Sequence, residues 1–139
     1  MDIVVLIGRV LFALLFLSSA VGHLTQTAGM AGYAQAKGVP MAKLSVQVTG
    51  VQLALGGLMV LFGIWADLGA LLLVAFLVPT ALLMHGFWKE SDDQAKQLEL
   101  VQFTKDLALA GAAFALFGFF AGAGHALGLT ITGPLFTLS

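Results

Sequence analysis

The side chains that could do chemistry in this sequence are few, and they stand among long apolar runs. The candidates are Arg9, His23, Tyr33, His85 and Trp88. Arg9 and His23 are fourteen residues apart, which places them within about 40° of each other on one helix face at 3.6 residues per turn. We therefore predict that these five residues line a polar pocket, as a binding site without a catalytic residue.

The two histidines near helix ends allow more than one interpretation. Facing helices can supply paired imidazoles to haem iron, but His23 and His85 alone do not predict a haem, and His125 lies at the opposite end. Alternatively, both histidines lie at the membrane interface and meet water and headgroups, as Tyr33 and Trp88 would in an aromatic belt. The sequence leaves the pocket and the interface as open alternatives.

Arg9 lies inside an apolar run, where a charge costs roughly 2.5–3.5 kcal/mol on insertion scales. One explanation is that its side chain extends to the outer headgroups and pairs with Asp67, which the sequence places on the same side. The other is that the guanidinium faces the protein interior and binds an anion or a headgroup. Residue type and spacing do not decide between these two roles.

Several classes of function are excluded by composition. The chain has no cysteine, which excludes disulfide scaffolds, thiolate metal sites and dithiol redox chemistry. No metal-ligand spacing, nucleophile–base pair or phosphate loop is present, so we predict no metal site and no self-contained catalysis. The net charge of −1 offers no basic face for nucleic acid.

The elements that must position the candidate residues are membrane-spanning helices. Hydrophobic residues make up 60% of the 139 residues and charged residues 9%, and the mean hydropathy is +1.02. Water-soluble domains carry about a quarter charged residues. Four apolar runs of roughly 21–23 residues are long enough to cross a bilayer as helices. We predict an all-α, four-helix membrane bundle in one domain, with spans at about 3–24, 44–66, 68–88 and 107–129.

The three connections differ in length and charge. Only Asp67 separates the second and third spans, which predicts a tight hairpin. The first and third connections are longer, and each is expected to contain a short amphipathic interfacial helix, at 30–37 and 94–103. All five lysines lie in or beside these two connections. The positive-inside rule therefore places both connections in the cytoplasm and both termini outside.

Small residues indicate where the helices approach closely. The fourth span has Gly111, Ala115, Gly118 and Gly122 at spacings of four, three and four. Helix association in lipid depends on such small residues because lipid removes the hydrophobic driving force. We expect this stripe to pack inside the bundle.

Three motifs resemble those of the DoxX family of small bacterial membrane proteins. The first span contains Gly8-Arg9 and ends in Gly22-His23-Leu24, and the next segment runs from Tyr33 to Gly38-Val39-Pro40. The third span ends in His85-Gly86-Phe87-Trp88. The resemblance covers nearly the whole chain, and His23 departs from it because many relatives carry lysine there. It implies a bacterial inner membrane location.

The resemblance also implies an association with quinone-linked redox systems, because one relative is a subunit of a thiosulfate:quinone oxidoreductase. On this basis we expect a redox-associated subunit with a protein partner, with quinone as the ligand to consider. The alternatives are a non-catalytic scaffold that recruits a soluble partner and, with less support, a small transporter. Membrane lipids are partners in each case, and the oligomeric state stays open.

Overall fold

The computed structural model describes residues 1–138, and this part of the chain is helical without β-strands. Four of its helices are long and apolar enough to cross a membrane, which confirms the predicted fold class. The helices are α1 (Asp2–Thr25), α2 (Thr27–Ala36), α3 (Ala42–Phe62), α4 (Ala66–Met84) and α5 (Asp93–Ala123), with the short 3-10 helices η1 (Phe87–Lys89) and η2 (Gly124–Ala126).

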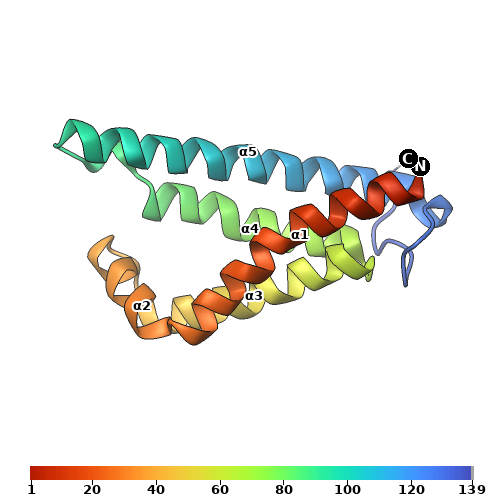
Figure 1. Ribbon diagram of the computed structural model, residues 1–139, viewed down its shortest axis with the longest axis horizontal. Helices are drawn as coiled ribbons and strands as arrows, with labels where there is room; N and C mark the ends of the chain where they lie inside the picture. The colour runs from red at the N-terminus through yellow and green to blue at the C-terminus, as the bar shows by residue number, and fades with distance from the viewer. Residues whose placement is uncertain (139) are drawn as a thin grey trace.

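The long helices run along the same axis, and the two ends of the molecule differ (Figure 1). One end, here called the connection end, holds α2 and the segment between α4 and α5. The other, the terminal end, holds both chain termini. In the described residues α3 packs between α1 and α4, and α4 packs between α3 and α5. The two lysine-bearing connections therefore share one end of the molecule.

The core joins all four long helices through apolar side chains such as Phe16, Leu53, Leu73 and Ala113. Helices α3 and α4 approach each other closely at Gly69. A methyl group on Gly69 would lie 2.6 Å from Cβ of Met59. Glycine at this crossing lets the two backbones meet, which is how small residues stabilise helix pairs in lipid.

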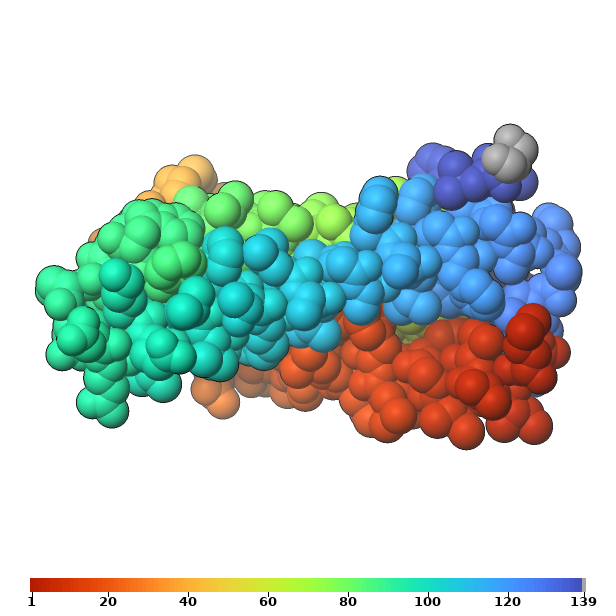
Figure 2. Space-filling view, turned by 90° about the horizontal axis from the view of Figure 1, so that it is seen from above, coloured from red at the N-terminus to blue at the C-terminus, as the bar shows by residue number. Residues whose placement is uncertain are grey.

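The small-residue stripe of α5 does not pack inside the protein. Nothing lies within 4 Å of a methyl group placed on Gly111, Gly118 or Gly122, and Figure 2 shows α5 along the surface. The helix packs through a different face, which includes Ala110 and Ala113. The expectation that the stripe fills the bundle interior was therefore wrong.

The third connection also differs from the expectation. Asp92 caps α5 by accepting a hydrogen bond from the Ala95 N–H at 2.8 Å, and the helix continues for 31 residues to Ala123. No glycine or proline interrupts residues 94–110, so the expected interfacial helix and fourth span form one rod. The rod ends at Gly124, whose φ of 57° favours glycine, rather than near residue 129.

The α3–α4 turn is longer than the single residue expected. Helix α3 ends at Phe62, Gly63 adopts a left-handed φ of 65°, and Asp67 lies in the first turn of α4. The C-terminal segment, residues 127–138, folds back over this turn. The Ile131 N–H donates to the Gly63 carbonyl at 3.1 Å, so the terminal end is closed by the chain itself.

Candidate functional site

Arg9 is fully buried and caps the C-terminal end of α3. Its Nε donates to the Val60 carbonyl at 2.8 Å, and its Nη2 donates to the Leu61 carbonyl at 2.6 Å. Its Nη1 donates to the Leu129 carbonyl at 2.8 Å. The last carbonyls of a helix lack intrahelical partners and carry partial negative charge. The guanidinium therefore faces the interior, where it binds backbone oxygens instead of headgroups or Asp67.

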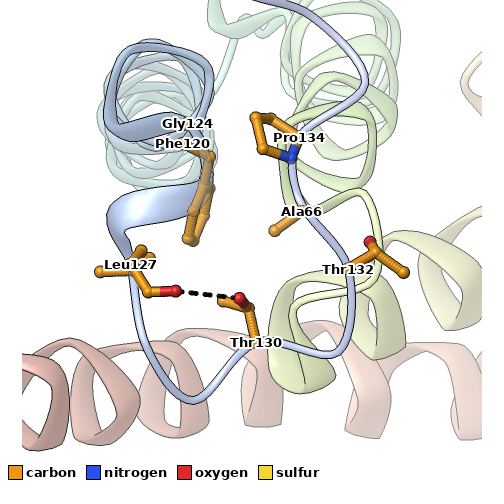
Figure 3. A pocket seen from close by; sticks show the side chains of 7 residues that line it. All are labelled: Ala66, Phe120, Gly124, Leu127, Thr130, Thr132 and Pro134. Carbon is orange, nitrogen blue, oxygen red and sulfur yellow. Dashed lines mark hydrogen bonds between the residues drawn. The ribbon is translucent and has the colours of Figure 1, made fainter.

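Asp67 holds the same C-terminal segment from the other side. It is 0% exposed, and its Oδ2 accepts from the N–H groups of Leu135 and Phe136 at 2.8 and 2.6 Å. The space beneath the segment, lined in part by Phe120, Leu127 and Thr130 (Figure 3), is only about 10 Å³. A void of that size holds at most one water molecule. Arg9 and Asp67 thus hold the C-terminal segment over a space that has no room for a larger ligand.

His23 is buried near the connection end of α1. Its Nδ1 lies 2.8 Å from the Ser19 carbonyl one turn earlier, and its ring meets the edge of Phe76 at a centroid distance of 5.8 Å. Among the described residues, no hydrogen bond or ion pair joins it to His85 or Tyr33. The structure therefore places His23 in the helix packing rather than in contact with the other candidates.

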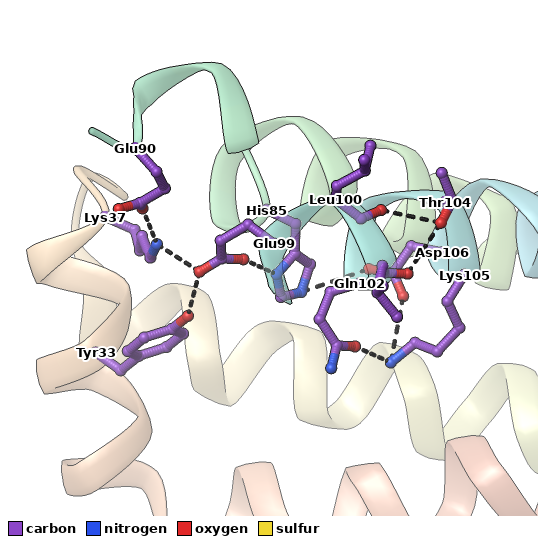
Figure 4. A network of polar contacts seen from close by, with 11 residues as sticks. Tyr33, Lys37, His85, Glu90, Glu99, Leu100, Gln102, Thr104, Lys105 and Asp106 are labelled. Carbon is purple, nitrogen blue, oxygen red and sulfur yellow. Dashed lines mark hydrogen bonds and ion pairs between the residues drawn. The ribbon is translucent and has the colours of Figure 1, made fainter. Parts of the chain in front are cut away.

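Tyr33 and His85 are brought together by charged residues that the predicted pocket did not include. Glu99 of α5 accepts from Lys37 Nζ at 2.7 Å, and the Tyr33 hydroxyl donates to the same carboxylate at 3.3 Å. Lys37 also donates to Glu90 at 3.0 Å. Figure 4 shows these side chains converging from α2, the α4–α5 connection and α5. We call the group the polar cluster; it comprises Tyr33, Lys37, His85, Glu90, Glu99 and Asp106.

His85 lies between two carboxylates of α5. Its Nδ1 is 2.8 Å from Glu99 Oε2, and its Nε2 is 3.7 Å from Asp106 Oδ2. Helix α4 ends at Met84, so His85 directly follows the helix, and its imidazole reaches across to α5. The two carboxylates are seven residues apart, which places them two turns apart on one face of the helix. One imidazole therefore bridges both.

The surroundings of Tyr33 and Lys37 stabilise the protonated form of each side chain. Hydrogen bonds to Glu99 and Glu90 raise the pKa of Lys37 well above its ordinary value. Partial burial, followed by the charge of Glu99, raises the pKa of Tyr33. Lys37 therefore remains an ammonium and Tyr33 a neutral phenol, and both act as hydrogen-bond donors.

Trp88 lies beside the cluster without joining it. Its ring is half exposed and meets the rings of Phe87 and Phe103 edge to face, at centroid distances of 5.2 and 5.7 Å. An exposed aromatic group at a helix end fits the membrane interface. Of the five predicted pocket residues, the structure thus joins Tyr33 and His85, places Trp88 nearby, and sets Arg9 and His23 elsewhere.

The missed residues had a partial signal in the sequence. Glu99 and Asp106 are seven residues apart, and Tyr33 and Lys37 are four apart, so each pair shares a helix face. Which faces meet depends on tertiary packing, which these spacings do not give. In the described residues no group of three or more histidine and carboxylate side chains has the geometry to hold a metal ion.

Comparisons with known proteins agree with the motifs of the sequence. The family model described as DoxX matches residues 4–86. The chain is 32% identical over 133 residues to inner membrane protein YqjF of Escherichia coli (strain K12), covering 96% of this chain and 86% of that protein. No solved structure gives a significant match. The chain, with its four membrane-length helices, therefore belongs to the DoxX family and is a multi-pass inner membrane protein.

Proposed function

We propose that this protein is a membrane subunit of a quinone-linked redox system and that it binds a quinone headgroup at the polar cluster. The observation that carries the proposal is the imidazole of His85 between Glu99 and Asp106, at the end of the bundle. A quinone carbonyl requires hydrogen-bond donors, and the conversion between quinone and quinol moves protons. The cluster offers both kinds of group.

The donor set suits this ligand. The Tyr33 hydroxyl, the Lys37 ammonium and the His85 ring nitrogens can each donate to a carbonyl oxygen. The rings of Phe87, Trp88 and Phe103 lie in edge contact beside them and offer an apolar surface for a flat ring. A bound quinone would supply the two-electron chemistry, and this chain's residues would bind it and exchange its protons.

We assign electron delivery to a partner protein. The chain has no cysteine, so a dithiol cannot serve as its own electron donor. The resemblance to redox-associated subunits supports an accessory role rather than a self-contained oxidoreductase. A partner would approach the connection end, where the cluster meets the membrane surface.

The two tryptophans of the chain give a direct test. Trp88 lies beside the cluster, whereas Trp65 precedes α4 at the terminal end. The Trp65→Phe variant keeps the reporter near the cluster, and the Trp88→Phe variant keeps the distant one. Each is purified in mild detergent and titrated with a short-chain ubiquinone analogue while tryptophan fluorescence is recorded. We expect saturable quenching in the Trp65→Phe variant and only weak, linear quenching in the other.

The role of the imidazole is tested in the Trp65→Phe background. His85→Ala removes a group whose hydrogen bond to the ligand contributes on the order of 1.4 kcal/mol, so Kd should rise about tenfold. His125→Ala, at the terminal end, is the matched control and should leave Kd unchanged. Equal quenching of both tryptophans, or an unchanged Kd after His85→Ala, would contradict the proposal.

A second candidate function is a scaffold that recruits a soluble protein, and the length of α5 favours it. The 31 residues of this helix extend about 46 Å, whereas the hydrocarbon core is about 30 Å thick. Several turns therefore reach beyond the core, with Lys96, Leu98 and Val101 exposed. If this surface recruits a protein, a partner that co-purifies in mild detergent should be lost from Lys96→Glu and retained in His85→Ala. The reverse pattern counts against the scaffold.

A further inference from the structure

Asp106 is the innermost acidic group of the polar cluster, and its surroundings are unusual for a carboxylate. The residue is 6% exposed. Within the described part of the chain it accepts no hydrogen bond, and its nearest cationic atoms are His85 Nε2 at 3.7 Å and Lys105 Nζ at 3.9 Å. Buried carboxylates normally accept hydrogen bonds or form close ion pairs. Asp106 has neither, so its lone pairs remain available.

Asp106 lies deeper along α5 than Glu99 does. It lies seven residues, about 10.5 Å, beyond Glu99 toward the bilayer interior, and it immediately precedes the apolar run that begins at Leu107. Glu99 is tied to the connection end through Lys37 and Tyr33. The two carboxylates therefore differ in depth, and His85 is the side chain that contacts both.

The carboxylates of the cluster outnumber by one the lysines that contact them. Three carboxylates, Glu90, Glu99 and Asp106, face two lysines, Lys37 and Lys105. A third cation is supplied only when the imidazole of His85 is protonated, and the alternative is a proton on Asp106 itself. Tyr33 is the remaining titratable member of the cluster, and on α1 the His23 ring contacts its own helix instead. A proton on either His85 or Asp106 would therefore balance the charges of this group.

We propose that Glu99, His85 and Asp106 form a proton relay from the connection end into the membrane-facing part of the bundle. A proton that reaches Glu99 passes to Nδ1 of His85 across the 2.8 Å contact. The imidazolium then moves toward Asp106, closing the 3.7 Å gap, and releases its Nε2 proton to that carboxylate. The ring returns to its starting tautomer by rotation or by the reverse transfer. Each transfer moves one proton between two named atoms, and no electron moves. The relay rests on the proposed function, in which it supplies protons to a quinone oxygen or removes them.

The relay is tested by infrared spectroscopy of the purified full-length protein in detergent between about pH 4 and pH 9, without any quinone. A protonated buried carboxyl gives a C=O stretch that ionised carboxylates lack. We expect a titrating C=O band in the parent protein that is absent from the near-isosteric Asp106→Asn variant. His85→Gln should move the midpoint of the band to higher pH by about one unit or more, because it removes the neighbouring cation.

A matched control separates the imidazole from a general loss of charge. Lys105→Gln removes a cation that lies 3.9 Å from Asp106, against 3.7 Å for His85, but the Lys105 side chain is 53% exposed and screened by water. It should move the midpoint by less than half as much as His85→Gln. A C=O spectrum identical in the parent and Asp106→Asn proteins, or one unaffected by His85→Gln, would overturn the relay.

The fluorescence titration distinguishes the relay from the proposed function. If the parent protein fails to bind the quinone analogue while the Asp106 band titrates as expected, the quinone proposal fails and the relay stands. If the analogue binds but the band is absent or insensitive to His85, the relay fails and the quinone site stands. Helical content and elution volume, measured for each variant, show whether the comparison is made between folded proteins.

Discussion

The replacement of Arg9 by glutamine tests most directly how the fold tolerates a charge in the membrane. The guanidinium is 1% exposed and makes three hydrogen bonds of 2.6–2.8 Å, two to the end of α3 and one to the C-terminal segment. Glutamine keeps one amide donor group on a shorter stem. It cannot reach three carbonyls from two segments at once, so at least two of them lose their partner.

The magnitude follows from the number and kind of these bonds. Hydrogen bonds that involve a charged group contribute about 1.5–3 kcal/mol each in water-soluble proteins, whereas interhelical bonds in membranes average about 0.6 kcal/mol. A value near 1 kcal/mol per bond gives roughly 3 kcal/mol for three bonds. The charge adds little to the free energy of the separated state, because an arginine in the separated α1 helix can extend to the interface. We expect Arg9→Gln to lower the free energy of unfolding by about 2–4 kcal/mol.

The assay is equilibrium unfolding in mixed micelles, followed by circular dichroism as the fraction of denaturing detergent increases. Lys43→Gln is the control, since it removes a positive charge from an exposed position. Arg9→Lys should fall between the parent and Arg9→Gln, because an ammonium keeps the charge without the planar donor array. If Arg9→Gln is as stable as Lys43→Gln, the three bonds do not hold the terminal end together and the reasoning is refuted.

Three further predictions concern packing, topology and the polar cluster. Gly69→Leu should destabilise the protein by at least about 2 kcal/mol in the same assay, because its Cβ would lie 2.6 Å from Cβ of Met59. In intact cells a membrane-impermeant maleimide should label a cysteine at Thr137 and not one at Lys96, since lysine placement predicts that the connection end is cytoplasmic. Glu99→Gln should release α2 and speed tryptic cleavage after Lys37. The pairing of Lys37 with Glu99 should also persist as the pH rises. Because the pKa of Lys37 is raised, the pair contributes its full stability below the ordinary lysine value of 10.5. That contribution is lost only as the pH rises through the raised pKa.

Each of these predictions has its own control. Gly111→Leu adds the same side chain where nothing lies within 4 Å, so equal destabilisation by both leucines would contradict the packing argument. Labelling at Lys96 in intact cells would reverse the orientation. Glu90→Gln removes the longer of the two Lys37 contacts, 3.0 Å against 2.7 Å, and should have the smaller effect on cleavage. If Glu99→Gln and the parent were cleaved at the same rate, Glu99 would not anchor α2.

The candidate site was only partly predictable from the sequence. Tyr33 stood out as an aromatic polar group in the first connection and His85 as a polar group near the end of the third apolar run, and both lie in the polar cluster. Glu99 looked like one surface charge among several in a connection, yet it accepts hydrogen bonds from α2 and contacts His85. Its role depends on the meeting of two helices whose residues are more than sixty positions apart. No local pattern encodes that contact.

Arg9 and the small-residue stripe of α5 were also predicted only in part. The cost of a charge in lipid predicted that Arg9 needs partners, but the partners are backbone carbonyls, which every residue has and no sequence pattern marks. Gly111 and Gly118 have the spacing of a packing motif, yet another face of α5 turned toward the core. Spacing identifies a helix face, and only the arrangement of all the helices decides which face is buried.

The sequence by itself determined that this protein lies in a membrane and that its long apolar runs are helical. Four apolar runs of membrane length must form helices, because hydrocarbon offers the backbone no other hydrogen-bond partners. The tertiary structure decided which polar groups meet: Arg9 with the end of α3, Asp67 with the C-terminal segment, and His85 with two acids of α5. The physical reason is the distance over which each property acts. Hydropathy is a sum over residues that are neighbours in the sequence, so the sequence contains it. A hydrogen bond acts over about 3 Å, between atoms that only folding brings together.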